Sequence, residues 1–382
     1  MIGGPAMARV LLGLCWLLGW QAAMAAGPSE VAKADFGLWP RAIESRAEFD
    51  AASRAELLAS AIVLDGLLKS ALQASDLGIK QIQADSLAKW KDKAKAVWLR
   101  SYADASRDCA KADLGCGFQG TSWEAFIAFA RRQEKEHLAK PPYSAWLANS
   151  HGFYPVYLKE QLRLAALFPR PSSEILALDD AEILGDEFKD RHFLLSLDDG
   201  PSPAGGYTDR YAELLSRNGV SAFFFALGNA LEQRLKKTSD ANLHKLYQNQ
   251  CLGSHGYEHK PHPNWPEWRT SLEKTQALIS RINPDQAAIM FRPPYGQRHA
   301  ELDQYIANQH GKVVLWNIDS QDWNVKIAAS EVADRVKKLM LLKRRGIVLF
   351  HDIHDKGLTA IPDILEFSQK SMLAWEDCRQ IQ

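Results

Sequence analysis

The pattern of hydrophobic positions changes partway along the chain. Up to about residue 187, apolar residues recur at helical spacing and strand-like alternation is scarce. The predicted helices of this part cover residues 53–72, residues 86–103, a segment starting at Thr121 or Ser122, and residues 155–167. Four tryptophans of this part are better explained as residues of a packed core than as a ligand site: Trp90, Trp98, Trp123 and Trp146. We therefore predict a mainly helical region without catalytic spacing.

Beyond residues 168–186, a stretch with two prolines that we predict to be a linker, short apolar runs alternate with helical patterns. The predicted strands are residues 193–197, 222–227, 250–253, 289–291, 313–316 and 347–350. The predicted helices are residues 207–217, 229–247, 266–282, 300–309, 330–343 and 361–375. This alternation predicts parallel strands covered by helices. About 195 residues are few for eight full units, so we expect a distorted, reduced (β/α) barrel in the α/β class.

The first 25 residues have the features of a secretory signal peptide. Arg9 supplies the charged start, Val10–Trp20 the apolar run, and Ala23–Ala25 a cleavage site of the A-x-A type. The apolar run is too short to span a bilayer, although a retained N-terminal anchor stays as an alternative. We expect a chain of three parts: a signal peptide over residues 1–25, a mainly helical domain over residues 26–187, and a barrel domain over residues 188–382.

Charge and cysteine content narrow the class of protein. Lys+Arg and Asp+Glu both number 46, so the basic excess that is typical of nucleic-acid binders is missing. Removal of a signal peptide would leave four cysteines, which suits an oxidising compartment. Four cysteines allow three pairings. The short glycine-containing loop favours Cys109 with Cys116, which leaves Cys251 with Cys378; a free, buried Cys251 is the alternative.

Ionisable residues follow the predicted strands directly. The first strand ends in Asp198 and Asp199, and α/β barrels carry their chemistry at this end of their strands, although Asp-Asp-Gly also forms turns. After the third strand come His255 and His259, and a helical turn there would place both rings on one face. Two imidazoles and one carboxylate suit a catalytic zinc ion, and cobalt or nickel also accept them. His262, which follows Pro261, is not expected to be a ligand.

Three further groups follow later strands. Arg292 could hold a carboxylate, and two prolines after it fix the backbone and lack N–H donors. Tyr295 then offers the first free N–H, which could serve an oxyanion. Asp322 follows the fifth predicted strand and His351 the sixth. A histidine whose protonated form is favoured by an aspartate is suited to act as a general acid.

Five stretches follow predicted strands and contain, in order, Asp198, His255, Arg292, Asp322 and His351. Together they resemble the polysaccharide deacetylases of carbohydrate esterase family four, the nodulation-protein-B homology domain. The resemblance covers about 190 residues, roughly half the chain, and no part of the helical region. The opening motif of the family usually reads Thr-Phe-Asp-Asp-Gly. Here Ser196 and Leu197 replace its first two residues and both carboxylates remain.

The resemblance implies a role for each position. Asp198 would be the general base, and Asp199, His255 and His259 would hold the metal. Arg292 would hold Asp198 in place, and the backbone N–H of Tyr295 would stabilise the oxyanion. His351 would be the general acid, and Asp322 would orient and charge it. Trp323 and Leu349 would line the pocket for the acetyl methyl, and Pro294 is assigned to the same substrate pocket.

The implied activity is metal-dependent, most simply zinc-dependent, removal of N-acetyl groups from an amino-sugar polysaccharide. Export without a membrane span suits a bacterial periplasm, where peptidoglycan and poly-N-acetylglucosamine-type polymers are candidate substrates and chitin oligomers a third. The alternatives are a non-catalytic periplasmic glycan-binding protein and a small-molecule amide or imide hydrolase on the same barrel. Trp265 and Trp268 could stack on sugars or anchor the next helix. The helical region could form a groove wall, bind a partner or stabilise the barrel.

Overall fold

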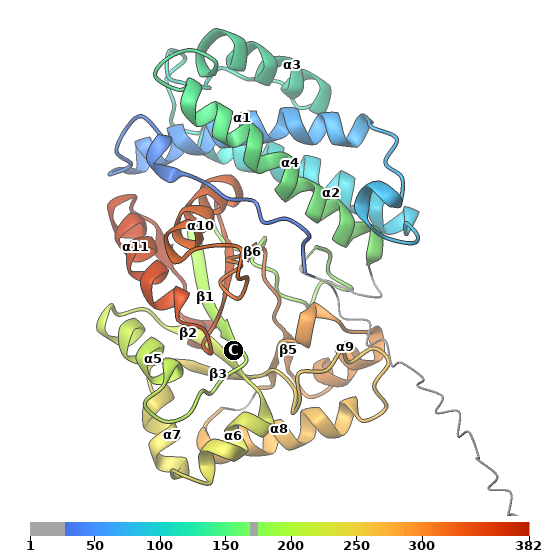
Figure 1. The fold of residues 1–382 in the computed structure, drawn as a ribbon, viewed down its shortest axis with the longest axis vertical. Coiled ribbons are helices and arrows are strands. Elements are labelled where there is room, and N and C mark those ends of the chain that lie inside the picture. The colour runs from blue at the N-terminus through green and yellow to red at the C-terminus, as the bar shows by residue number, and fades with distance from the viewer. Residues whose placement is uncertain (1–26, 169–174, 287, 382) are drawn as a thin grey trace, which may run out of the picture.

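The computed structural model describes residues 27–168, 175–286 and 288–381, so the predicted signal peptide lies outside the described residues. Its N-terminal part is a layer of helices that lies over the α/β part (Figure 1). These helices are α1 (Arg46–Lys69), α2 (Ala84–Ala105), α3 (Trp123–Gln133) and α4 (Ser144–Leu167). As predicted, Ser122 caps α3, where its hydroxyl accepts a hydrogen bond from the Ala125 N–H. Trp90, Trp98, Trp123 and Trp146 are buried, which confirms them as core residues.

Helix α4 begins earlier than predicted. The sequence pattern placed its start at Pro155, a residue type that often begins helices, but the helix starts at Ser144 and Pro155 lies inside it. An internal proline costs one backbone hydrogen bond. The turns before it bury Trp146, Phe153 and Tyr154, and this packing holds the helix across the proline.

The α/β part is a parallel sheet with the strand order β5-β4-β3-β2-β1-β7-β6, and β8 pairs with β1. The strands are β1 (His192–Asp198), β2 (Ala222–Ala226), β3 (Cys251–Ser254), β4 (Met290–Phe291), β5 (Lys312–Val313), β6 (Ile318–Asp319), β7 (Gly346–His351) and β8 (Ala374–Trp375). Every strand pair is parallel. Among the described residues β5 and β6 do not pair with each other, so the barrel is open. This is the predicted distorted, reduced barrel.

The covering helices follow the predicted alternation with two corrections. They are α5 (Tyr207–Arg217), α6 (Gly228–Leu235), α7 (Asp240–Tyr247), α8 (Trp268–Ile282), α9 (Ala300–Ala307), α10 (Ala329–Lys343) and α11 (Lys356–Lys370). The single helix predicted over residues 229–247 is two helices, because the Ser239 hydroxyl accepts from the Asn242 N–H and starts α7. The helix predicted over residues 361–375 begins at Lys356 and ends at Lys370. Ala374 then pairs with His192 of β1.

The register of the sheet brings the predicted chemistry together. Asp198 at the end of β1 lies opposite His351 at the end of β7, and opposite Phe225 of β2. β3, which ends just before His255, is the next strand beyond β2. Because all of these strands are parallel, their carboxyl ends meet at one edge of the sheet.

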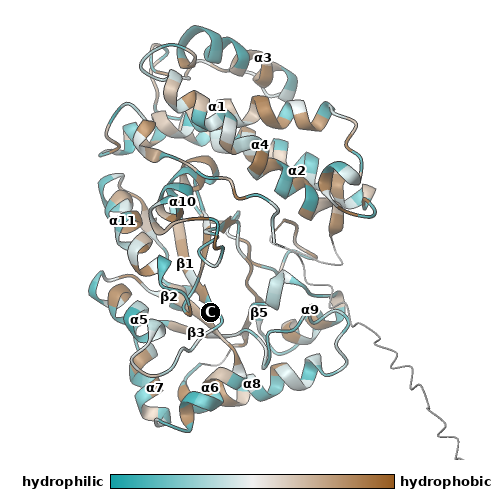
Figure 2. Cartoon of the chain, in the orientation of Figure 1, coloured by the Kyte–Doolittle hydropathy of each residue, from teal (hydrophilic) through white to brown (hydrophobic). Residues whose placement is uncertain are grey.

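The helical layer and the α/β part share one hydrophobic core. A single cluster of buried apolar side chains includes Phe49 of α1, Leu158 of α4 and Leu339 of α10. In Figure 2, the helices of both parts carry hydrophobic and hydrophilic stripes, as expected for helices that bury one face. Residues 175–186, part of the predicted linker, also pack: Ile175 and Leu184 are buried and Ile183 forms a parallel bridge with Val314.

A buried ion pair crosses this interface. The Lys338 Nζ of α10 lies 2.9 and 2.8 Å from the two carboxylate oxygens of Glu56 in α1, and both side chains are almost fully buried. Nζ also donates to the Ser150 hydroxyl of α4 at 2.8 Å. The charges are therefore compensated only when the helical layer is docked on α10.

Breaking this pair is expected to destabilise the whole molecule. Lys338→Met would leave the Glu56 carboxylate buried without its partner, and such losses cost about 3–5 kcal/mol. Urea unfolding of Lys338→Met and of the control Glu366→Gln, which removes an exposed pair with Lys370, measures the difference. The control should cost no more than about 1 kcal/mol. An equal loss of unfolding free energy in the two variants would mean that the buried pair does not couple the helical layer to the α/β part.

Both favoured disulfides are present. Cys109 pairs with Cys116 in the loop after α2, and Cys251 of β3 pairs with Cys378 near the C-terminus. The second bridge ties the middle of the sheet to the last described turn.

Candidate active site

Asp199, His255 and His259 form the one group of possible metal ligands among the described residues. The Nε2 atoms of His255 and His259 each lie 3.4 Å from Asp199 Oδ1, and the three candidate ligand atoms lie within 4.8 Å of one another. The backbone carbonyl of Arg292 accepts a 2.7 Å hydrogen bond from His255 Nδ1, which orients the ring so that Nε2 faces the carboxylate.

The surroundings of these residues suit a cation. Within the described ranges, the buried Asp199 Oδ1 atom has no hydrogen-bond partner. A buried carboxylate oxygen without a partner is costly unless a ligand satisfies it. Burial and the nearby His259 hold the pKa of His255 well below its ordinary value, and burial also lowers the pKa of His259. Both imidazoles are thus neutral, the form that binds metals.

The two histidines are not brought together by a helical turn, as the sequence analysis expected. Residues 255–259 form an irregular bend after β3. Gly256 has a φ of +79°, a left-handed conformation that is accessible to glycine at little cost. A Cβ atom at this position would lie 2.9 Å from the His262 ring, so the bend also requires a residue without a side chain. His262 is buried beneath the bend and is not part of the ligand group.

Asp198 is a buried carboxylate held by one arginine. Arg292 Nη1 donates to Asp198 Oδ1 and to the Ser196 hydroxyl, both at 2.8 Å. The Arg292 Nε and Nη2 atoms donate to the carbonyls of Val314 and Leu315, so the guanidinium is fixed on every side. Burial raises the pKa of Asp198 to about 6, against the lowering effect of Arg292. A carboxylate with this pKa accepts a proton near neutral pH.

Tyr295 supplies a backbone donor. Its φ of +59° is unusual for a residue with a side chain, and such conformations gather at functional sites. The N–H groups of the next two residues donate to Pro293 and Pro294, whereas no acceptor for the Tyr295 N–H is found in the described parts of the chain. The Tyr295 ring lies 4.4 Å from the His259 ring, next to the ligand group.

His351 is paired with Asp322. His351 Nδ1 lies 2.8 Å from Asp322 Oδ1, and the His351 backbone N–H donates to Oδ2 at 2.9 Å. Burial disfavours the charged imidazole, but the Asp322 carboxylate outweighs it and raises the pKa of His351 to about 10. The ring is therefore protonated at neutral pH, with Nε2 available as a proton donor.

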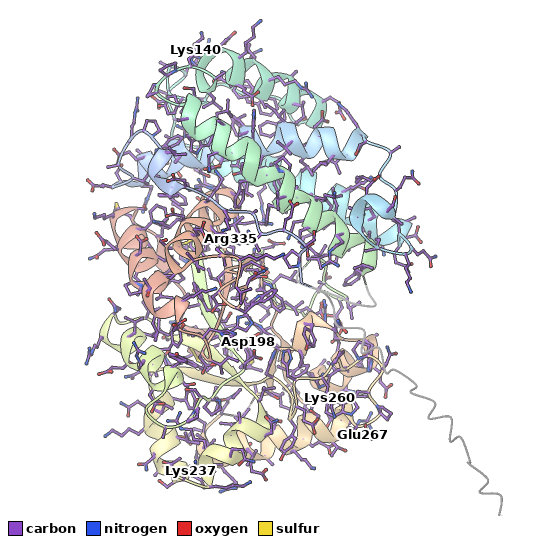
Figure 3. The ribbon with its side chains drawn as sticks, in the orientation of Figure 1. Lys140, Asp198, Lys237, Lys260, Glu267 and Arg335 are labelled. Carbon is purple, nitrogen blue, oxygen red and sulfur yellow. A yellow bond between two sulfur atoms is a disulfide. The ribbon has the colours of Figure 1, made fainter. Side chains whose placement is uncertain are left out.

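These groups face a cavity of about 640 Å³. Asp198, Asp199, His255, His259, Tyr295 and His351 contribute to its lining, together with Trp323 and Leu349 of the predicted substrate pocket. Pro294 is buried and does not line it. Arg292 and Asp322 lie behind the lining, where they contact Asp198 and His351. In the view of Figure 3, Asp198 lies near the centre of the molecule, and Arg335 lies between Asp198 and the helical layer.

Residues 185–314, which run from just before β1 to just past β5, match the model of the polysaccharide deacetylase family. We call these residues the deacetylase segment, after the family model that they match. Asp322 and His351 lie beyond the matched residues.

The deacetylase segment also has curated relatives. Over 183 residues the chain is 30% identical to a peptidoglycan-N-acetylglucosamine deacetylase of Bacillus cereus, covering 45% of this chain and 63% of the relative. It is 27% identical over 164 residues to a bifunctional xylanase/xylan deacetylase of Cellvibrio japonicus, covering 41% of this chain and 22% of that relative. The chain thus spans less than two thirds of either relative. A crystal structure of a peptidoglycan N-acetylglucosamine deacetylase aligns with a TM-score of 0.45 at 21% identity, over 51% of this chain and 90% of that one.

The structure adds residues that the sequence analysis did not assign to the site. One side of the cavity is formed by α4 and by residues 27–32, which lie outside the deacetylase segment. No local signal marks them, because a partly polar stripe on a helix equally suits a solvent-exposed face. Trp268 is buried at the start of α8 and, like Trp265, does not line the cavity, which favours the helix-anchoring interpretation.

Proposed function

We propose that this protein is a metal-dependent hydrolase that removes N-acetyl groups from an amino-sugar polysaccharide and releases acetate. The observation that carries the proposal is the placement of three different groups around one cavity. They are an unpartnered carboxylate oxygen facing two neutral imidazoles, a buried proton acceptor at Asp198, and a protonated imidazole at His351. Hydrolysis of an amide needs each of these: an electrophilic centre, a base and an acid.

Asp199, His255 and His259 would hold the metal, and zinc suits this donor set. Once bound, a divalent metal supplies Lewis-acid polarisation of the acetamide carbonyl and lowers the pKa of water to about 7. Asp198 takes the proton of the attacking water, and Arg292 keeps its carboxylate in position. The Tyr295 N–H donates to the carbonyl oxygen as negative charge develops there. One such donor typically contributes about 2.7–4 kcal/mol of barrier reduction.

His351 completes the reaction. The amine nitrogen leaves poorly unless it is protonated, and His351 Nε2 donates that proton as the C–N bond breaks. Asp322 holds the ring by Nδ1, which keeps the proton to be donated on Nε2. The products are acetate and a free amino sugar.

The substrate class and the location follow from the same proposal. Peptidoglycan and poly-N-acetylglucosamine-type polymers are the proposed substrates, and the similarity to the Bacillus cereus peptidoglycan-N-acetylglucosamine deacetylase supports the first of them. The proposed signal peptide would direct the protein to the periplasm of a bacterium. None of the described helices is long and apolar enough to cross a membrane. We propose residues 26–187 and 188–382 as its two domains, held together by their shared core.

Acetate release tests the function directly. The purified protein, treated with chelator and then supplied with zinc, is offered peptidoglycan, poly-N-acetylglucosamine and chitin oligomers in parallel. We expect zinc-dependent acetate release from at least one of them, and none before zinc is restored. Stoichiometric zinc binding without acetate release from any of the three would contradict the proposal.

A further inference from the structure

The catalytic cavity has a second wall that comes from the helical region. Seven residues of α4 line it across from the deacetylase segment: Val156, Tyr157, Glu160, Gln161, Arg163, Leu164 and Leu167. Their spacing of three and four residues places them along one stripe of the helix. Because most of them are only partly buried, this stripe is open to the cavity rather than closed against the barrel.

The N-terminal strap, which we define as Gly27–Ala32, extends this wall. It lines the same cavity. Lys326 Nζ donates to the Ser29 carbonyl at 2.7 Å and Arg335 Nη1 to the Ala32 carbonyl at 3.0 Å, so the strap is held to the loop before α10 and to α10 itself. Gly27 lies against the Trp323 indole, where an added Cβ would be 2.5 Å from a ring carbon.

The chemistry of the α4 stripe suits a sugar ring. Glu160 and Arg163 hold each other through two hydrogen bonds of 2.7 Å, so their charges compensate. Gln161 is uncharged, lines the cavity, and has no hydrogen-bond partner among the residues that the structure describes. An amide both donates to and accepts from hydroxyl groups, and apolar neighbours such as Leu164 match the C–H face of a pyranose ring.

The size of the cavity also favours a ligand larger than one acetamide group. An acetamide group at Asp198 and His351 fills only a small part of about 640 Å³, which lies in the range of sites for much larger ligands. The rest of the cavity is lined in part by α4. A ligand that extends from the reacting acetamide toward α4 therefore meets Gln161 and its apolar neighbours.

We infer that the α4 stripe is a sugar-binding subsite, which recognises the residue next to the one that is deacetylated in an uncharged N-acetylated amino-sugar oligosaccharide. The inference rests on the proposed function for the position of the reacting sugar. It assigns to the helical region the role of a specificity-determining wall, in addition to its packing against α10.

Oligosaccharide binding tests the subsite separately from turnover. Titration calorimetry in the zinc-loaded Asp198→Asn background compares N-acetylglucosamine with the chitin tetramer. We expect the tetramer to bind at least about tenfold more tightly, and Gln161→Ala to weaken tetramer binding by about tenfold, the value of one good hydrogen bond. Leu164→Trp, which fills the subsite, should weaken it at least as much. Neither change should alter monosaccharide binding.

Lys159→Ala is the matched control, because Lys159 is exposed on the same helix and does not line the cavity. Its tetramer affinity should equal that of the background. Unchanged tetramer affinity in both Gln161→Ala and Leu164→Trp, or no preference for the tetramer at all, would overturn the subsite. Tetramer binding that depends on Gln161, in a protein whose parent releases no acetate, would instead uphold the subsite and refute the proposed activity.

Discussion

Asp198→Asn is expected to lower acetate release by about 10²–10⁴-fold while zinc binding stays stoichiometric, because the amide keeps the shape of the carboxyl group but cannot take a proton. The amide oxygen can still accept from Arg292 Nη1, so the surrounding packing is retained. Zinc content, acetate release and thermal unfolding of the purified variant provide the three measurements needed.

Asp303→Asn is the matched control for this change. Asp303 is also a buried acid of the α/β part, on α9, but it does not line the cavity. Its activity should remain within about twofold of the parent, since it contacts no reacting group. An Asp198→Asn variant that lost zinc would place Asp198 in the coordination sphere, and one with near-parental activity would exclude it as the base.

His255→Ala is expected to abolish stoichiometric zinc binding and with it acetate release. The change removes one of three ligands and the only one that is oriented by the Arg292 carbonyl. Loss of a residue that merely orients a ligand typically costs 10–100-fold in metal affinity, so loss of the ligand itself should cost about 100-fold or more. Zinc content by atomic emission and acetate release at a fixed zinc concentration measure the two effects.

His262→Gln separates the loss of a ligand from the loss of a buried histidine. His262 lies seven residues further on, is buried beneath the Gly256 bend and stands outside the ligand group. This variant should keep its zinc. If it lost zinc as completely as His255→Ala does, the bend as a whole, rather than the His255 imidazole, would determine metal binding.

The helical region is more than an attachment to the deacetylase segment. It shares a core with α10 and places a buried carboxylate, Glu56, against Lys338. The same docking sets α4 across the cavity from Asp198. A variant that loosens the interface should therefore weaken oligosaccharide binding as well as stability.

The sequence by itself predicted where the candidate catalytic side chains gather. Asp198, Asp199, His255, Arg292 and His351 each follow a short apolar run, and parallel strands must bring such positions to one edge of the sheet. The alternation of apolar runs and helical patterns was enough to predict a distorted, reduced barrel. Both predictions, of the site positions and of the barrel, depend on local periodicity in the sequence, which does not require knowledge of distant contacts.

Only the tertiary structure decided how these residues meet. His255 and His259 converge through the left-handed bend at Gly256, where the spacing alone suggested a helical turn. The strand pair β8–β1 and the second wall formed by α4 depend on packing between segments far apart in sequence. A stripe such as Val156–Leu164 has the same pattern whether it faces water, a core or a substrate, because a pattern records the polarity of a surface and not what lies opposite it.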